Sequence, residues 1–239
     1  MIDKKTFLDN AADAWQFSLD VAWDQNRRHP ELSRGKCLRE RSFLRTLLQT
    51  DQAEVFAKAC VMADKVDDKY EMDILLPELL GYMEENLYPP SLDNPEFAPG
   101  RSFRYALNDK HYCYIHIRNA KVPVSFLRDP EYVAAGLREM MDISEEKDGC
   151  SVIYTATWLN SLPAFLRFFP EEWKQNIYML PGGEFGPTTG WQGQFINGKG
   201  LLNKAHAAEF LRTGVLPYAR VESFCPFSSL REHLKKIGL

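Results

Sequence analysis

The sequence predicts an α/β protein of the mixed α+β kind, with a helical N-terminal third followed by a mixed β-sheet flanked by helices. Three observations predict this fold class. Hydrophobic residues recur at helical spacing through the first 88 residues, four prolines fall between residues 89 and 100, and the hydrophobic pattern then changes to the alternation of strands. We therefore expect a helical region over 1–88, a proline-rich linker or loop over 89–100, and a mixed-sheet α/β domain over 101–239.

The helical third contains four runs of hydrophobic residues at helical spacing. The first run steps by four or three residues from Leu8 through Trp15 to Ala22, which places its members on one stripe of a helix. Pro30 lies beyond this stripe and is expected to end the helix. The other runs cover residues 38–48, 55–66 and 76–87, and the short polar joints between them are typical of neighbouring antiparallel helices.

The sheet region begins with two alternating segments, 101–107 and 111–119, on either side of a turn. We expect these segments to pair as an antiparallel hairpin. Asp129 before Pro130 predicts a helix start, because a carboxylate can cap the helix and proline suits its first position. The remaining expected elements are a strand over 151–158, a helix over 163–177 interrupted at Pro170, a strand over 191–196, a helix over 203–213, a strand over 216–224, and a helix over 229–237 with capping-box spacing between Ser229 and Glu232.

Charge and composition exclude several classes of partner. The 239 residues carry 29 basic and 33 acidic side chains, for a net charge of −4, and no long basic run. We therefore expect no nucleic-acid partner. No segment approaches the roughly eighteen unbroken apolar residues that cross a bilayer, and no secretory signal is visible, so we expect no membrane partner. A small-molecule ligand and a homo-oligomer both remain open.

The cysteines and the absent motifs bear on location and cofactors. Five cysteines lie far apart without a CxxC pair, which predicts reduced, buried thiols in a cytoplasmic protein. The sequence contains no phosphate-binding P-loop, no HExxH and no GxSxG. His111 and His116 face opposite sides of one expected strand, so we assign no metal site. The cofactor is unknown, and no pattern is specific enough to assign the chain to a family.

The expected strand over 111–119 supplies the most informative residues. Its alternation places Cys113, Ile115 and Ile117 on one face, and Tyr114, His116 and Arg118 on the other. Histidine can carry a proton near neutral pH, and arginine can hold a carboxylate or phosphate with two parallel hydrogen bonds. The alternative is an ordinary polar sheet face that is hydrated or covered at its edges.

Two further clusters offer candidate ligand-binding residues. Trp158, Asn160 and Ser161 lie where a strand passes into a helix, at the kind of position where α/β sheets often bind ligands. The alternative is that Asn160 or Ser161 caps the next helix while Trp158 belongs to the core. A glycine-rich region then offers Gln192 and Gln194 on one strand face, and Lys199 in a turn able to hold an anion. The alternative for this second cluster is an uneventful surface loop and turn.

These residues lead to one hypothesis and one alternative. The hypothesis is a cytoplasmic protein that acts on a small polar or anionic molecule by group transfer, for example acyl transfer, with His116, Arg118 and Asn160 as catalytic residues. Tyr114, Trp158, Ser161, Gln192, Gln194 and Lys199 would bind the ligand. The alternative is a non-catalytic binding or assembly protein that uses the helical N-terminal region, with aromatic residues such as Trp15 and Trp23, as its interaction surface. The sequence does not decide whether the chain is an enzyme.

Overall fold

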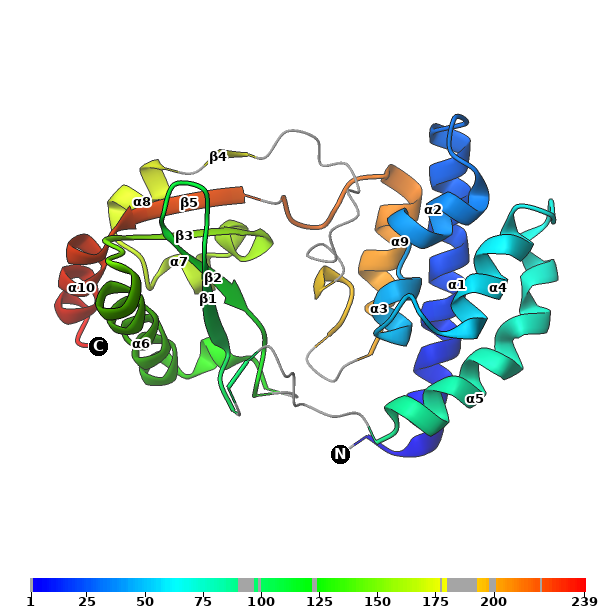
Figure 1. Ribbon diagram of the computed structural model, residues 1–239, viewed down its shortest axis with the longest axis horizontal. Helices are drawn as coiled ribbons and strands as arrows, with labels where there is room; N and C mark the ends of the chain where they lie inside the picture. The colour runs from blue at the N-terminus through cyan, green and yellow to red at the C-terminus, as the bar shows by residue number, and fades with distance from the viewer. Residues whose placement is uncertain are drawn as a thin grey trace. The chain divides into compact units, whose positions relative to one another are not determined.

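The chain forms two compact units, which are described separately. A computed structural model describes residues 2–89, 97–98, 100–121, 124–176, 178–179, 193–197, 201–219 and 221–239. The first unit, called the helical unit, combines residues 1–91 with 184–217, and the second, called the sheet unit, combines 92–183 with 218–239. Helices followed by a mixed sheet with its own helices confirm the predicted α/β fold class (Figure 1).

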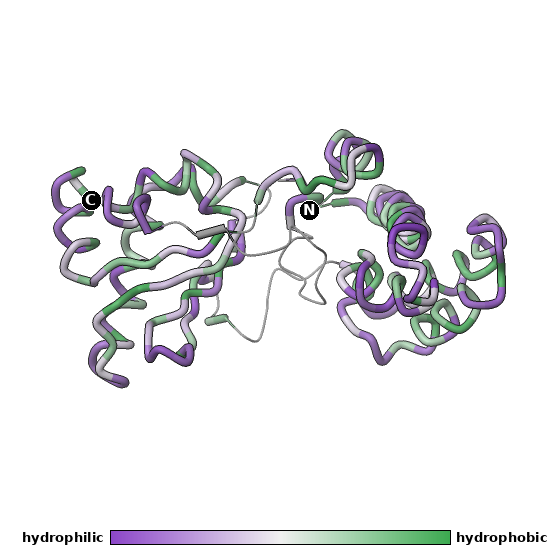
Figure 2. Tube along the Cα trace, turned by 90° about the horizontal axis from the view of Figure 1, so that it is seen from above, coloured by the Kyte–Doolittle hydropathy of each residue, from purple (hydrophilic) through white to green (hydrophobic). Residues whose placement is uncertain are grey.

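The helical unit is built from amphipathic helices around one hydrophobic core. Its elements are α1 (Lys4–Arg28), α2 (Arg34–Arg41), α3 (Leu44–Leu48), α4 (Glu54–Ala63), the 3-10 helix η1 (Lys69–Leu75), α5 (Leu76–Leu87) and α9 (Lys204–Thr213). Asp3 caps α1 by accepting from the Thr6 amide, and Ser33 caps α2 by accepting from the Lys36 amide. Hydrophobic and hydrophilic residues alternate along these helices, as Figure 2 shows, and the hydrophobic ones fill the core.

The predicted helical run over 38–48 is two helices, because the chain bends at Ser42. Ser42 has extended backbone angles between α2 and α3. Its buried hydroxyl donates to the carbonyl of Leu38 and accepts from the amide of Leu44. A serine side chain that bonds to nearby backbone competes with the helix, and here it closes α2 and opens α3.

Residues 193–197 and 201–213 lie in the helical unit, whereas the hydrophobic pattern predicted that they belong to the sheet domain. Phe195 and Phe210 are fully buried in the core of the helical unit, where both rings contact Phe17 of α1. The predicted strand over 191–196 is reduced, within 193–197, to an isolated bridge between Ile196 and Leu202. The hydrophobic pattern of a segment predicts that it is buried, but it does not predict in which of the two cores the segment lies.

The sheet unit contains a five-stranded mixed sheet in the order β1-β2-β3-β5-β4. The strands are β1 (Phe103–Leu107), β2 (Cys113–Ile117), β3 (Val152–Thr157), β4 (Tyr178–Met179) and β5 (Val221–Pro226). β1 and β2 pair antiparallel, which confirms the predicted hairpin. β2 and β3 pair parallel, and β5 pairs antiparallel with both β3 and β4.

Helices of the sheet unit pack on one face of this sheet. They are η2 (Phe126–Arg128), α6 (Pro130–Asp148), η3 (Trp158–Ser161), α7 (Pro163–Leu166), α8 (Glu171–Gln175) and α10 (Phe227–Lys236). Asp129 caps α6 by accepting from the Tyr132 amide, as predicted. α6 and α10 lie side by side on the sheet, and Arg231 of α10 pairs with Asp142 and Glu145 of α6 (Figure 1).

In the sheet unit, the sequence-based starts of β5 and α10 are wrong, and one short strand was not predicted. β5 begins at Val221, whereas the prediction began this strand at residue 216. α10 begins at Phe227, directly after Pro226 and without a side-chain cap, so Ser229 and Glu232 do not form the predicted capping box. The two-residue strand β4 falls in a segment for which the sequence predicted no strand.

Among the described residues, no helix has both the length and the apolar composition needed to cross a membrane.

Candidate functional site

One face of the sheet carries aromatic and charged side chains in place of core residues. Cys113, Ile115 and Ile153 point into the core of the sheet unit, so the residues that alternate with them point to the opposite face. We call this opposite face the aromatic face. Its half-buried members are Arg104, Tyr114, His116, Tyr154, Glu222 and Phe224. None of them belongs to the described core of the sheet unit.

Aromatic rings form a continuous chain of contacts across this face. The Tyr114 ring lies 4.4 Å from the His116 ring and 5.1 Å from the Tyr154 ring, between centroids. Tyr154 donates a hydrogen bond of 2.7 Å from its hydroxyl to Oε2 of Glu222. The contacts therefore lead from the histidine on β2, through two tyrosines, to a carboxylate on β5. Such rings offer flat surfaces for a ligand, and the hydroxyl and carboxylate add polar partners.

Positive charge gathers at the β1–β2 end of the aromatic face. Arg104 and His116 are direct partners in the antiparallel register. Arg118 follows His116 by two residues, and its amide extends the ladder by donating to the Ser102 carbonyl at 2.9 Å. The guanidinium groups of Arg104 and Arg118 lie 5.5 and 5.0 Å from the centroid of the buried Phe97 ring. Two guanidinium groups and an imidazole therefore share one end of the face, which suits an anionic group.

Asn160 has a different setting from the one that the sequence suggested. Its side chain is 2% exposed and lies in the core between η3, β3, β5 and α8. The side-chain amide donates to the carbonyls of Thr155 and Val221, and its oxygen accepts from the indole of Trp173. Both amide hydrogens are thus committed to the fold, which argues against the predicted catalytic role of Asn160.

The neighbouring predicted residues, Trp158 and Ser161, also make structural contacts. Trp158 stacks on Tyr218, with 5.5 Å between centroids and an interplanar angle of 19°. Ser161 donates from its hydroxyl to the carbonyl of Ala219. The alternative role that the sequence left open, capping of the next helix, is not observed, because α7 begins after Leu162 without a side-chain cap. Both residues therefore anchor the segment that enters β5.

The predicted glutamines and lysine do not extend this site. Gln194 is buried in the helical unit, and its main-chain carbonyl contacts Nδ1 of His206 at 2.9 Å. Gln192 and Lys199 lie outside the described residues. Of the predicted set, the structure thus brings together Tyr114, His116 and Arg118.

Sequence reasoning does not single out Arg104 or Glu222. The hairpin register would reveal Arg104, because pairing the strands around the turn at 108–110 sets it opposite His116. Glu222 alternates with the buried residues Val221 and Ser223 and lies inside the predicted strand over 216–224, but alternation alone does not mark this carboxylate as part of a site. The position of Glu222 next to Tyr154 depends on the order of β3 and β5 in the sheet, which periodicity does not give.

The cysteine side chains offer no reactive nucleophile. All five thiols are free and buried. Burial raises the pKa of the Cys60 and Cys113 thiols to about 11, and it also raises the pKa of Cys225. Cys113 points into the core, away from His116, and its sulfur contacts the Met140 carbonyl. Because the thiolate is the reactive form, we expect these cysteines to be unreactive in the folded protein.

We expect the native protein to resist thiol alkylation. At pH 7.5, iodoacetamide should modify the five cysteines much more slowly than it modifies a short cysteine-containing peptide, since the thiols are buried and protonated. In denaturant all five should react at the peptide's rate. Intact-mass measurement over time reads both rates, and one cysteine that reacts at the peptide's rate in native protein would contradict the assignment for that residue.

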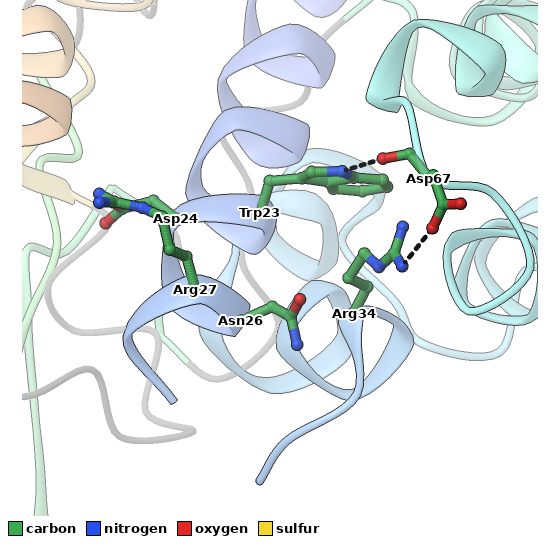
Figure 3. A pocket seen from close by; sticks show the side chains of 6 residues that line it. All are labelled: Trp23, Asp24, Asn26, Arg27, Arg34 and Asp67. Carbon is green, nitrogen blue, oxygen red and sulfur yellow. Dashed lines mark hydrogen bonds and ion pairs between the residues drawn. The ribbon is translucent and has the colours of Figure 1, made fainter. Parts of the chain in front are cut away.

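The helical unit has an open hollow of about 420 Å³ on its surface. It is lined by Trp23, Asp24, Asn26, Arg27, Arg34 and Asp67 (Figure 3). The indole of Trp23 donates to the Asp67 carbonyl, and the Arg34 guanidinium lies over the indole ring and pairs with the Asp67 carboxylate at 2.9 Å. Asp24 pairs with Arg27 at 2.6 Å. These charged groups pair with one another, so the hollow is best explained as the joint between α1, α2 and the segment before η1.

Neither a metal nor a known relative identifies the site. The described residues contain no cluster of three or more histidine, cysteine or acidic side chains able to hold a metal. Comparisons with protein-family models, curated proteins and solved structures find no match. The aromatic face therefore has to be interpreted from its own geometry.

Proposed function

We propose that the protein binds a small polar or anionic molecule on the aromatic face of the sheet unit. The observation that carries this proposal is the cluster of Arg104, His116 and Arg118 at one end of a face that also presents tyrosine rings. Guanidinium groups bind carboxylates and phosphates through charge-assisted hydrogen bonds. Tyrosine rings can pack against the uncharged part of the same molecule.

His116 is the member of this cluster that can exchange a proton near neutral pH. A ligand held by the two arginines would lie beside its ring, so His116 is our candidate for proton transfer. Group transfer, with acyl transfer as one version, stays a prediction from the sequence. The hydrogen bonds of Asn160 do not support a catalytic role for this residue in group transfer. Lys199 lies outside the described residues. Free, buried thiols are compatible with the proposed cytoplasmic location.

The alternative function, an interaction surface on the helical region, gains less support. Trp15, Phe43 and Phe56 are fully or almost fully buried in the helical core, and Trp23 is half-buried under Arg34. Aromatic residues inside a core cannot contact a partner. No observation on the described surface of the helical unit favours a particular partner.

A thermal-shift experiment with benzoate and phenyl phosphate tests the proposal. Each ligand should raise the melting temperature of the wild-type protein, because a ligand that binds the folded state stabilises it. The shift should be lost in Arg104→Gln and Arg118→Gln, each compared with its own ligand-free melting temperature. Lys147→Gln is the matched control, since this exposed residue of α6 removes one positive charge from the helix-covered side of the sheet. Equal shifts in all three variants, or no shift in wild type, would overturn the proposal.

A further inference from the structure

The aromatic face also has an acidic end, and strand β3 lies between it and the cationic end. On β5, Glu222 is the direct partner of Ala156 in the antiparallel register with β3. The parallel register between β2 and β3 pairs Tyr114 with Tyr154, and carried two residues further it sets Ala156 beside His116. His116, Ala156 and Glu222 therefore follow one another across three neighbouring strands.

Alanine at the centre of this row has only a methyl group between two longer polar side chains, and we call the part of the face over Ala156 the gap. Neighbouring strands are spaced by about 4.8 Å, so the backbones of His116 and Glu222 are about 10 Å apart. The methyl group of Ala156 fills little of that span. The adjacent row of the face places Tyr114 and Tyr154 along one side of the gap, with 5.1 Å between their ring centroids. The gap thus has a cationic end, an acidic end and an aromatic side.

Glu222 is placed to accept a cationic group. Oε2 of Glu222 accepts from the Tyr154 hydroxyl, which holds the carboxylate in position. In the part of the chain that the structure describes, Oε1 has no hydrogen-bond partner within the protein. A carboxylate fixed on one oxygen and available on the other can pair with an ammonium group, and the nearby tyrosine ring adds a favourable contact for a cation.

We infer that the ligand of the aromatic face is a zwitterion, with an anionic group and an ammonium group at opposite ends of a flat or apolar middle. This inference rests on the proposed binding function and names the chemical class of the ligand. The anionic group pairs with Arg104, His116 and Arg118, the middle lies over Ala156 against the tyrosines, and the ammonium group pairs with Glu222. An amino acid whose two charged groups are separated by a ring or a short chain has this form.

Three matched compounds test the inference by isothermal titration calorimetry. The zwitterion para-(aminomethyl)benzoate carries both charges, para-methylbenzoate lacks the ammonium group, and para-methylbenzylamine lacks the carboxylate. The zwitterion should bind about tenfold more tightly than para-methylbenzoate, which corresponds to one charge-assisted hydrogen bond. Glu222→Gln should remove this tenfold difference without changing the affinity for para-methylbenzoate. Ala156→Leu should weaken both carboxylates, because its side chain fills the gap.

The outcomes separate this inference from the function on which it rests. Glu146→Gln is the matched control, since it removes an exposed carboxylate from α6 on the other side of the sheet and should keep the tenfold difference. Equal affinities for the zwitterion and para-methylbenzoate, in wild type and in Glu222→Gln, would overturn the inference and leave anion binding intact. If neither carboxylate binds, both the inference and the proposed function are wrong.

Discussion

Replacing Asn160 by alanine is expected to lower the free energy of unfolding of the sheet unit by about 3 kcal/mol. The substitution removes two hydrogen bonds to the carbonyls of Thr155 and Val221 and one from the indole of Trp173. Each of these three groups loses its hydrogen bond to Asn160, and water has little access to a site that is 2% exposed. An unsatisfied buried polar group costs about 1–3 kcal/mol, so three of them together make a large effect.

Hydrogen exchange measured by mass spectrometry localises this loss to the correct unit. Peptides from β3 and β5 should exchange faster in Asn160→Ala, while peptides from α1 and α5 of the helical unit provide an internal reference. Ser161→Ala is the matched control, because this half-buried neighbour makes one hydrogen bond, to the Ala219 carbonyl, and should cost only about 1 kcal/mol.

The same variant decides between two roles for Asn160. The sequence suggested a catalytic residue that converges with His116 and Arg118, whereas the contacts of its amide indicate a residue that joins β3, β5 and α8. If hydrogen exchange in β3 and β5 of Asn160→Ala is as slow as in wild type and ligand binding is lost, the catalytic interpretation is supported. If hydrogen exchange in these strands is faster and the folded fraction still binds the ligand, the structural interpretation is supported.

Much of the fold can be predicted from local patterns in the sequence, because interactions between residues close together in the chain form these elements. The stripe from Leu8 to Ala22 gives α1, and Asp129 before Pro130 gives the start of α6. The alternating segments around the turn at 108–110 give the hairpin, whose register follows from a short connection. In each case the residues that determine the element lie within it or directly beside it in the sequence.

The rest of the fold depends on contacts between residues far apart in the chain. Phe195 and Phe210 show a buried pattern, but their partner Phe17 precedes them by well over one hundred residues. Part of the candidate site also depends on such contacts. His116 and Arg118 come from strand alternation, whereas Glu222 joins them only because β5 pairs with β3. The role of Asn160 depends on such contacts too, since its position after β3 is equally suited to binding a ligand and to joining strands.

A pair of helical glycines gives the second large effect, with opposite signs at the two positions. Gly35→Ala in α2 should destabilise the helical unit by about 3 kcal/mol, whereas Gly81→Ala in α5 should stabilise it by about 1 kcal/mol. A Cβ atom at Gly35 would lie 2.2 Å from the main-chain oxygen of Cys60 in α4. The same atom at Gly81 meets nothing within 4 Å.

The cost at Gly35 arises from backbone that cannot move aside. Its amide donates to the Asp64 carboxylate at 2.6 Å, so the start of α2 is held against the end of α4. An added methyl group must push the two helices apart, which also weakens this hydrogen bond and the packing of buried Cys37 and Cys60. At Gly81, by contrast, alanine only reduces the backbone freedom of the unfolded chain and favours the helix.

Urea denaturation followed by circular dichroism measures both variants against wild type. Because the two substitutions add the same methyl group to a helix of the same unit, the difference between them isolates the close approach of α2 to α4. A Gly35→Ala protein as stable as Gly81→Ala would mean that α2 and α4 are not in contact at Cys60. Opposite shifts of the midpoint would instead show that this one glycine sets the distance between two helices that together bury Cys37, Leu38 and Phe56.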